Sequence, residues 1–147
     1  MAEILLGSHV GMSGKEMFLG SVKEAESYGA NVLMVYTGAP QNTRRKEIGE
    51  LRIDEGISYA EKAGIREIVI HAPYIINLGN MEKPEMFDFG VEFLAKEVKR
   101  AAAFHSKVLV LHPGSSLSAG VEASVEQIAK GLNLVLDADD REVNIAL

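Results

Sequence analysis

Short apolar runs alternate with longer amphipathic stretches along the whole chain, and this alternation restricts the fold more than any other feature. Runs of strand length lie at 4–6, 31–36, 67–71, 107–112 and 142–147. Between them, apolar residues recur every three or four positions, which is the period of a helix with one buried face. The predicted order is βαβαβαβαβ. Apolar strands separated by such helices indicate a parallel sheet covered by helices.

Local signals predict where the helices begin and end. Ser13 with Glu16 has the spacing of a capping box and predicts the start of the first helix. Gly29 is placed to end that helix, and Gly64 to end the second. Pro84 suits the first position of a long third helix.

Two architectures are compatible with this pattern. An open, doubly wound sheet of five strands is a complete domain at 147 residues. A (β/α)8 TIM barrel takes about 250 residues, so the chain would be a (βα)4β half of one. The pattern alone favours the open sheet, because that fold needs no further strands. In both architectures a ligand site lies at the carboxyl ends of the strands.

The length of the chain suits a single α/β domain over residues 1–147, and its composition excludes several classes of protein. The chain has no cysteine, which excludes disulfides and thiolate metal sites and suits a cytoplasmic protein. Its formal charge of −6 argues against a broadly basic nucleic-acid binder, although metal ions can supply local positive charge. No apolar run approaches the ~20 residues of a membrane span, so we expect no membrane association.

Two histidines are predicted at the ends of consecutive strands. Val69-Ile70 runs into His71, and Val110-Leu111 runs into His112. Neighbouring parallel strands lie ~4.8 Å apart, so both imidazoles can reach one metal ion or two adjacent ions. His9 and Tyr36 end the first two strands and are candidates to line the same site. A zinc site needs three or four protein ligands, and no aspartate or glutamate lies at another predicted strand end.

The loop that follows Tyr36 is the one locally basic loop of the sequence. Its arginines and lysine, Arg44, Arg45 and Lys46, are suited to pairing with phosphates. Gln41 and Asn42 are suited to contacts with bases or sugars. Tyr74, just after His71, can stack on or wedge into a duplex. Taken without the histidines, the same residues are more typical of a solvated loop.

Several motifs in a fixed order resemble one family. They are Gly7-Ser8-His9-Val10, the run Tyr36 to Arg44 (YTGAPQNTR), the run His71 to Gly79 (HAPYIINLG), Lys83-Pro84-Glu85, Leu111-His112-Pro113-Gly114 and Asn144-Ile145-Ala146-Leu147. With these motifs the chain resembles bacterial endonuclease IV, the zinc-dependent apurinic/apyrimidinic endonucleases of base-excision repair. The nine residues from His71 are the most specific motif. The resemblance covers all 147 residues, but only about the first half of a typical member.

The resemblance implies a fold, a reaction and a set of site residues. The fold is a TIM barrel with three zinc ions at its C-terminal face, with His71 and His112 as the first two protein ligands. Gln41, Asn42, Arg44 and Tyr74 are implied to contact duplex DNA and help to flip out the abasic nucleotide. The implied enzyme is a phosphoric ester hydrolase that cuts 5′ to abasic sites. Beyond the metal ligands, no catalytic residue is implied in this part of the family's sequence.

Two departures from the family lead to expectations about this chain. Ser116 stands where members often have histidine, and the family's zinc-bridging glutamate follows Asn-Ile-Ala-Leu, whereas this chain ends at Leu147. We therefore expect at most weak, partial zinc binding, negligible nuclease activity of residues 1–147 alone, and self-association through the uncovered half-barrel. Two alternatives stay open. One is a non-catalytic, self-associating half-barrel, and the other is a metal-dependent barrel of the sugar isomerase or epimerase type.

Overall fold

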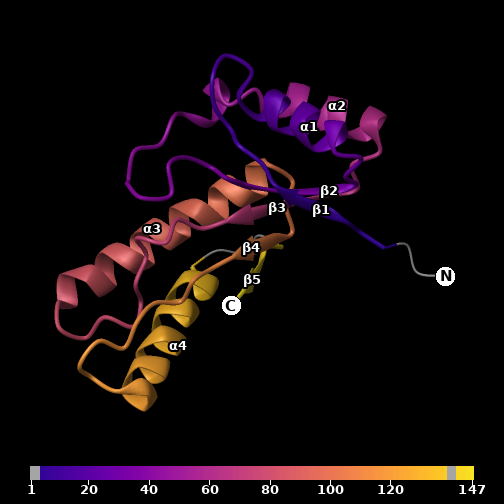
Figure 1. Ribbon diagram of the computed structural model, residues 1–147. Helices are drawn as coiled ribbons and strands as arrows, with labels where there is room; N and C mark the ends of the chain where they lie inside the picture. The colour runs from indigo at the N-terminus through magenta and orange to yellow at the C-terminus, as the bar shows by residue number, and fades with distance from the viewer. Residues whose placement is uncertain (1–3, 139–141) are drawn as a thin grey trace.

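The computed structural model describes residues 4–138 and 142–147, and its strands form a single parallel sheet (Figure 1). Within that part of the chain the strands are β1 (Gly7–His9), β2 (Val32–Tyr36), β3 (Glu67–His71), β4 (Val108–Val110) and β5 (Asn144–Ala146). The helices are α1 (Met17–Ser27), α2 (Ile53–Ala63), α3 (Pro84–Ala103) and α4 (Val121–Asp137), with a short 3-10 helix, η1 (Ile48–Glu50), before α2. The predicted alternation of strands and helices is confirmed.

The order of the strands decides between the two predicted architectures. The sheet runs β1-β2-β3-β4-β5, so each strand pairs in parallel with the strand that precedes it in the sequence. A doubly wound sheet reverses its strand order at a switch point, and its helices cover both faces. Figure 1 instead shows α1 to α4 fanned around one side of the sheet. The chain is a (βα)4β half of a TIM barrel, and the open doubly wound alternative is wrong.

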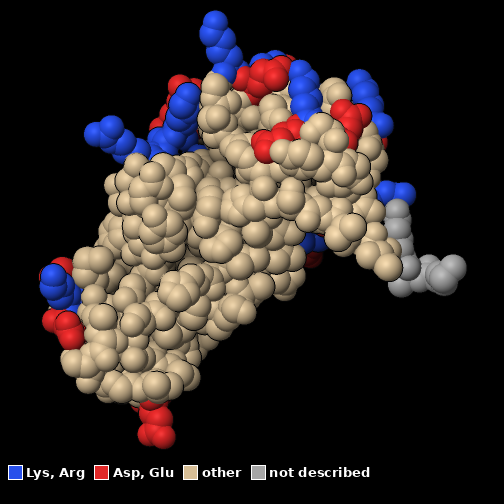
Figure 2. Space-filling view, in the orientation of Figure 1, with Lys and Arg blue, Asp and Glu red and all other residues tan. Residues whose placement is uncertain are grey.

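The two faces of the sheet differ in burial. Leu33 and Val35 of β2, Ile70 of β3 and Leu109 of β4 are at most 1% exposed, because they point toward the helices. Their neighbours along each strand, such as Val32 and Met34, are only half-buried and point to the opposite, inner face. In Figure 2 the charged side chains gather over α1 and α2 and along the rims, leaving a broad surface without charge.

The core between sheet and helices is closely packed. Phe18 of α1 and Phe104 are fully buried and meet edge to face, with their ring centroids 4.8 Å apart. A Cβ atom added to Gly56 of α2 would lie 2.4 Å from the Phe18 ring, so α2 approaches α1 where only glycine fits. This packing fixes α1 and α2 over β1 and β2, and with them the loops at the ends of those strands.

Some predicted boundaries are confirmed and others are wrong. Gly29 and Gly64 have positive φ values of 70° and 77° beside the helix ends, and Pro84 begins α3, as predicted. The first strand is Gly7–His9 rather than residues 4–6. The capping box at Ser13 is absent from α1, which begins at Met17 without a side-chain cap. A turn at residues 14–16 precedes the helix.

None of the helices in residues 4–138 and 142–147 has both the length and the apolarity needed to cross a bilayer.

Candidate functional site at the carboxyl ends of the strands

Three aromatic side chains from consecutive strands meet at the carboxyl end of the sheet. Tyr36, the last residue of β2, is in register with His71, the last residue of β3, and their ring centroids lie 4.9 Å apart. His9, which ends β1, lies 4.6 Å from Tyr36 and 6.2 Å from His71. The predicted meeting of His9, Tyr36 and His71 at one site is thus present on the inner face of the half-barrel.

The hydrogen bond of His71 determines which nitrogen of the neutral ring carries the lone pair. Nδ1 of His71 lies 2.6 Å from the carbonyl oxygen of Ala72. A carbonyl oxygen can only accept, so Nδ1 carries the proton in this contact and the neutral ring keeps its lone pair on Nε2. Metal-binding histidines commonly use this arrangement, in which one nitrogen donates to a backbone carbonyl and the other binds the ion. This tautomer of His71 is one in which Nε2 can bind a metal ion.

The second predicted ligand, His112, lies two residues beyond the end of β4. Val110 is in register with His71, and Leu111 N–H donates to the carbonyl of Ala146 at 2.8 Å, so the backbone stays in the sheet almost to His112. The side chain of His112 is exposed.

The residues present supply only part of a metal site. Among the described residues, no group of three or more His, Asp or Glu side chains is placed to hold a metal ion. Zinc needs three or four protein ligands, and this chain offers His71 and His112. The two histidines suit zinc in type and, for His71, in tautomer, but they do not complete a zinc site.

The loops that follow β3 and β4 are fastened to each other. Oδ1 of Asn77 accepts hydrogen bonds from the backbone N–H groups of Gly79 and Ser115, each at 3.0 Å. Leu78 N–H donates to the carbonyl of Pro113 at 3.1 Å. Gly114 between them has φ 129°, and a Cβ atom there would lie 2.1 Å from Asn77 Oδ1. These contacts hold the His71 loop and the His112 loop as one unit.

The pKa of His9 is lowered from its ordinary value. The main cause is partial burial, which disfavours the charged imidazolium, and the second is repulsion from His71. His9 is therefore biased toward the neutral form, in which an imidazole can accept a hydrogen bond or bind a cation.

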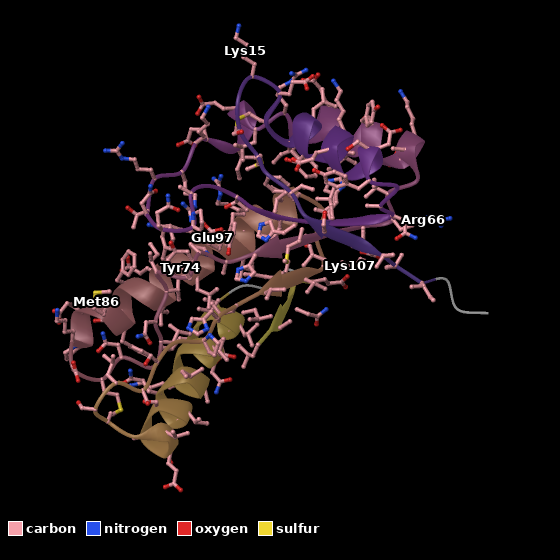
Figure 3. All side chains as sticks on the ribbon, viewed as in Figure 1. Lys15, Arg66, Tyr74, Met86, Glu97 and Lys107 are labelled. Carbon is pink, nitrogen blue, oxygen red and sulfur yellow. The ribbon has the colours of Figure 1, made fainter. Side chains whose placement is uncertain are left out.

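The predicted DNA-contacting residues lie on the loops around this cluster. Gln41 and Arg44 are exposed, while Asn42 is half-buried and its Oδ1 accepts a hydrogen bond from the Arg44 backbone N–H at 2.9 Å. Tyr74 is 53% exposed and lies at the end of the sheet opposite Arg66 and Lys107 (Figure 3). Gln41, Arg44 and Tyr74 are thus free to meet a ligand, whereas Asn42 also shapes its own loop.

Arg45 does not face the solvent, contrary to its predicted pairing with phosphate. Its side chain is 11% exposed, and its Nε donates to the carboxylate of Glu97 on α3 at 2.7 Å. Sequence reasoning missed Glu97, although a signal was present. Glu97 falls three residues after Leu94 and one before Val98, within the apolar stripe of its helix. A carboxylate in that position must be buried with a partner.

A hollow of about 820 Å³ lies beside the aromatic cluster, between the loop after β1 and the loop after β2. Its lining includes His9, Tyr36, Met12, Met17, Arg44 and Lys46. The hollow combines an apolar floor with a basic rim, which suits a ligand that carries both an apolar surface and a negative charge.

Comparison with known proteins agrees with this geometry. The sequence model described as "Xylose isomerase-like TIM barrel" matches residues 22–147. The chain belongs to this family. Membership explains the consecutive strand order, and it confirms the half-barrel.

Within the family, the chain is similar to proteins named "Probable endonuclease 4", and endonuclease 4 is a hydrolase. It is 61% identical to the one from Lachnoclostridium phytofermentans over 134 residues, which cover 91% of this chain and 45% of the relative. It is 58% identical to the one from Lysinibacillus sphaericus over 144 residues, covering 98% and 48%. The resemblance to endonuclease IV is confirmed, and the chain spans about half the length of the curated relatives it matches.

Solved structures show the same relationship. Endonuclease IV from Thermus thermophilus superposes with a TM-score of 0.71 at 27% identity, over 90% of this chain and 47% of that one. A D-tagatose 3-epimerase-like protein superposes with a TM-score of 0.60 at 19% identity, over 95% and 51%. The second likeness shows the shared barrel fold alone.

Proposed function

We propose that this chain is the N-terminal half of an endonuclease IV-type DNA repair nuclease, which cuts the phosphodiester 5′ to abasic sites in duplex DNA. The single observation that carries the proposal is the strand-end cluster of His9, Tyr36 and His71, with the lone pair of neutral His71 on Nε2, in a chain 61% identical to a probable endonuclease 4. We also propose a cytoplasmic location, which suits a sequence without cysteine.

We assign roles to the chain's own residues from their positions and from the resemblance to endonuclease IV. His71 and His112 would hold zinc, which acts as a Lewis acid toward a phosphodiester when it is bound in a complete site. Arg44 is exposed on the loop after β2 and would pair with a backbone phosphate, which positions the duplex. Three side chains would enter the minor groove beside the abasic nucleotide. They are Gln41 and Asn42 on the same loop and Tyr74 on the loop after β3.

A chimera tests this proposal. Residues 1–147 replace the matching half of the Lachnoclostridium phytofermentans relative, and the substrate is a labelled duplex with one abasic site. We expect zinc-dependent cleavage 5′ to the abasic site that leaves a 3′-hydroxyl. Replacing both His71 and His112 with alanine in the chimera should reduce the rate by several orders of magnitude, because two zinc ligands are lost.

The unmodified chain of 147 residues serves as the second arm of the experiment. Because it offers two zinc ligands, we expect negligible cleavage by this chain alone. Cleavage by the chain alone at the rate of the full-length relative would contradict the expectation that two zinc ligands are too few for activity. A folded chimera without cleavage at abasic sites would contradict the proposed function.

A second candidate, a self-associating half-barrel without activity of its own, is favoured by a different observation. Ile4 and Leu6, before β1, are 81% and 75% exposed, and Leu147, after β5, is 70% exposed. Apolar side chains beside unpaired strand edges promote association between chains. The solved structures do not support the sugar epimerase alternative, because the similarity to the D-tagatose 3-epimerase-like protein is one of fold alone.

A further inference from the structure

We propose that Glu97 is a positioning residue, which fixes the loop between β2 and η1 (residues 37–47) in the shape that presents Gln41 and Arg44 to DNA. The inference rests on the proposed function, because that function assigns DNA contacts to this loop. Glu97 itself is 0% exposed and lies on α3, so it touches no ligand and acts through the loop (Figure 3).

The loop has little regular structure of its own. A single backbone hydrogen bond within it is described, from Asn42 N–H to the Ala39 carbonyl at 3.5 Å. Its carbonyl oxygens are instead bound by two buried guanidinium groups. Nη1 of Arg45 donates to the carbonyls of Ala39, Asn42 and Arg44 at 2.8–3.2 Å. Arg100 donates to the carbonyls of Thr37 and Lys46 at 2.9 and 3.0 Å.

Glu97 connects both guanidinium groups. Its Oε1 accepts from Arg45 Nε at 2.7 Å, and its Oε2 accepts from the Thr37 hydroxyl at 2.7 Å. The Thr37 hydroxyl in turn accepts from Arg100 Nε at 2.9 Å. One carboxylate from α3 therefore connects, directly or through Thr37, to the two arginines that bind the loop.

The charges explain why this position needs a carboxylate. Arg45 and Arg100 are both largely removed from water, and burial lowers the pKa of Arg100. Two buried cations repel each other, and an anion between them offsets that repulsion. Nη2 of Arg45 is buried without a hydrogen-bond partner among the described residues. The carboxylate of Glu97, 2.7 Å from Arg45 Nε, offsets the buried charge of this guanidinium.

Packing also encloses the Arg45 side chain. Its guanidinium sits 5.0 Å from the centroid of the Phe93 ring. A Cβ atom on Gly38 would lie 2.8 Å from Arg45 Cδ, so the loop closes tightly over the side chain. Without the Glu97 charge, we expect Arg45 to turn out to solvent and the loop to lose its shape.

Variants of the 147-residue chain test the inference. Glu97→Gln keeps the shape and removes the charge, and Glu92→Gln, at an exposed glutamate of the same helix, is the matched control. Thr37→Val removes the bridging hydroxyl with little change of volume, and Thr37→Ser restores it. The thermal unfolding of each variant is followed by circular dichroism, so that loop effects are compared among folded chains.

The first measurement is trypsin cleavage after Arg44, Arg45 and Lys46, resolved by mass spectrometry. Losing a buried, charge-assisted hydrogen bond should raise the cleavage rate there about tenfold to hundredfold in Glu97→Gln and Thr37→Val. Thr37→Ser and Glu92→Gln should cleave like wild type. The side-chain Nε–H resonance of Arg45 should shift in Glu97→Gln, since its acceptor changes. Unchanged cleavage and an unchanged resonance in folded Glu97→Gln would overturn the inference.

The second measurement separates this inference from the proposed function. Binding to a duplex with a tetrahydrofuran abasic analogue is followed by fluorescence anisotropy. We expect Glu97→Gln to weaken binding about as much as the double variant Gln41→Ala/Arg44→Ala does. The triple variant that carries all three changes should bind no more weakly than the double variant. The positioning role would be overturned if Glu97→Gln bound DNA as tightly as wild type while trypsin cut its loop faster. Absence of binding by wild type would instead contradict the proposed DNA contacts, while the cleavage result would still decide the anchoring by Glu97.

Discussion

At the scale of single residues, the contact between His71 and Ala72 has the clearest chemical consequence. The 2.6 Å hydrogen bond keeps the proton on Nδ1 and leaves Nε2 as the donor atom for an ion. His112 adds a second imidazole from the next strand, and the Asn77 contacts hold the two loops together. The geometry thus presents two candidate ligands, and no group of three or more His, Asp or Glu side chains among the described residues is placed to hold an ion.

This partial set of ligands predicts weak zinc binding. After gel filtration with zinc in the load, we expect elemental analysis to find less than about one zinc per chain, because two ligands leave half of the coordination sphere to water. His71→Asn and His112→Asn should each remove most of the zinc that the chain still binds. His105→Asn is the control, because His105 is exposed near the end of α3 and asparagine tolerates its φ of 55°. Retention of two or more zinc ions per chain would contradict this prediction.

At the scale of elements, the close contact between α1 and α2 sets two effects against each other. Gly56→Ala gains about 1 kcal/mol of helix propensity. The added Cβ atom would lie 2.4 Å from the Phe18 ring, and overpacking of a core costs about 1–3 kcal/mol. Phe18 has little room to move, because it is fully buried and also packs on Phe104. The cost of overpacking should therefore exceed the gain in helix propensity.

We therefore expect Gly56→Ala to lower the free energy of unfolding by about 1 kcal/mol, measured by urea denaturation. Gly49→Ala is the matched control, since no atom lies within 4 Å of an added Cβ atom there. That change should leave the stability nearly the same. A more stable Gly56→Ala chain would mean that Phe18 can shift.

The strands and helices themselves could be predicted from sequence, but some of their ends could not. Residues 4–6 are apolar, yet β1 starts at Gly7, because its ladder partner β2 begins at Val32. Asn31 binds the preceding segment instead, with Leu6 N–H donating to Asn31 Oδ1 at 2.7 Å. These contacts join residues far apart in sequence, so no local pattern reveals them.

The site, too, could be predicted only in part from the sequence. Strand ends place His9, Tyr36 and His71 together, and the pattern of the sequence shows where strands end. The pairing of Arg45 with Glu97 spans 52 positions between a loop and a helix, and nothing near Arg45 in the sequence indicates it. A basic run therefore suggested three solvent-facing cations where the structure turns one of them inward.

At the scale of the whole molecule, the half-barrel leaves two strand edges and the inner face of its sheet uncovered. Pattern alone could not show this, because open sheets and barrels share the same alternation of strands and helices. The strand order distinguishes them. In the described sheet, β1 pairs with β2 and β5 pairs with β4, so each end strand keeps one edge unpaired.

These edges predict that the chain associates with itself. We expect light scattering to report dimers or larger species at micromolar concentration, because apolar Leu6 and Leu147 lie 75% and 70% exposed beside the edges. Leu6→Lys together with Leu147→Lys should shift the chain toward monomer. Leu117→Lys, at a leucine 49% exposed in the loop after β4, should associate like wild type. A monodisperse wild-type monomer would contradict the prediction.

The consecutive strand order also bears on how the chain folds while it is being synthesised. Each strand finds its partner in the βα unit made just before it, so the sheet can grow in the order in which the ribosome releases it. The loop after β2 is anchored later. Thr37 meets Glu97 across 60 positions, so that loop stays unanchored until α3 has emerged. β1 and β2 are therefore both available for pairing before the residue that anchors the loop after β2 has been made.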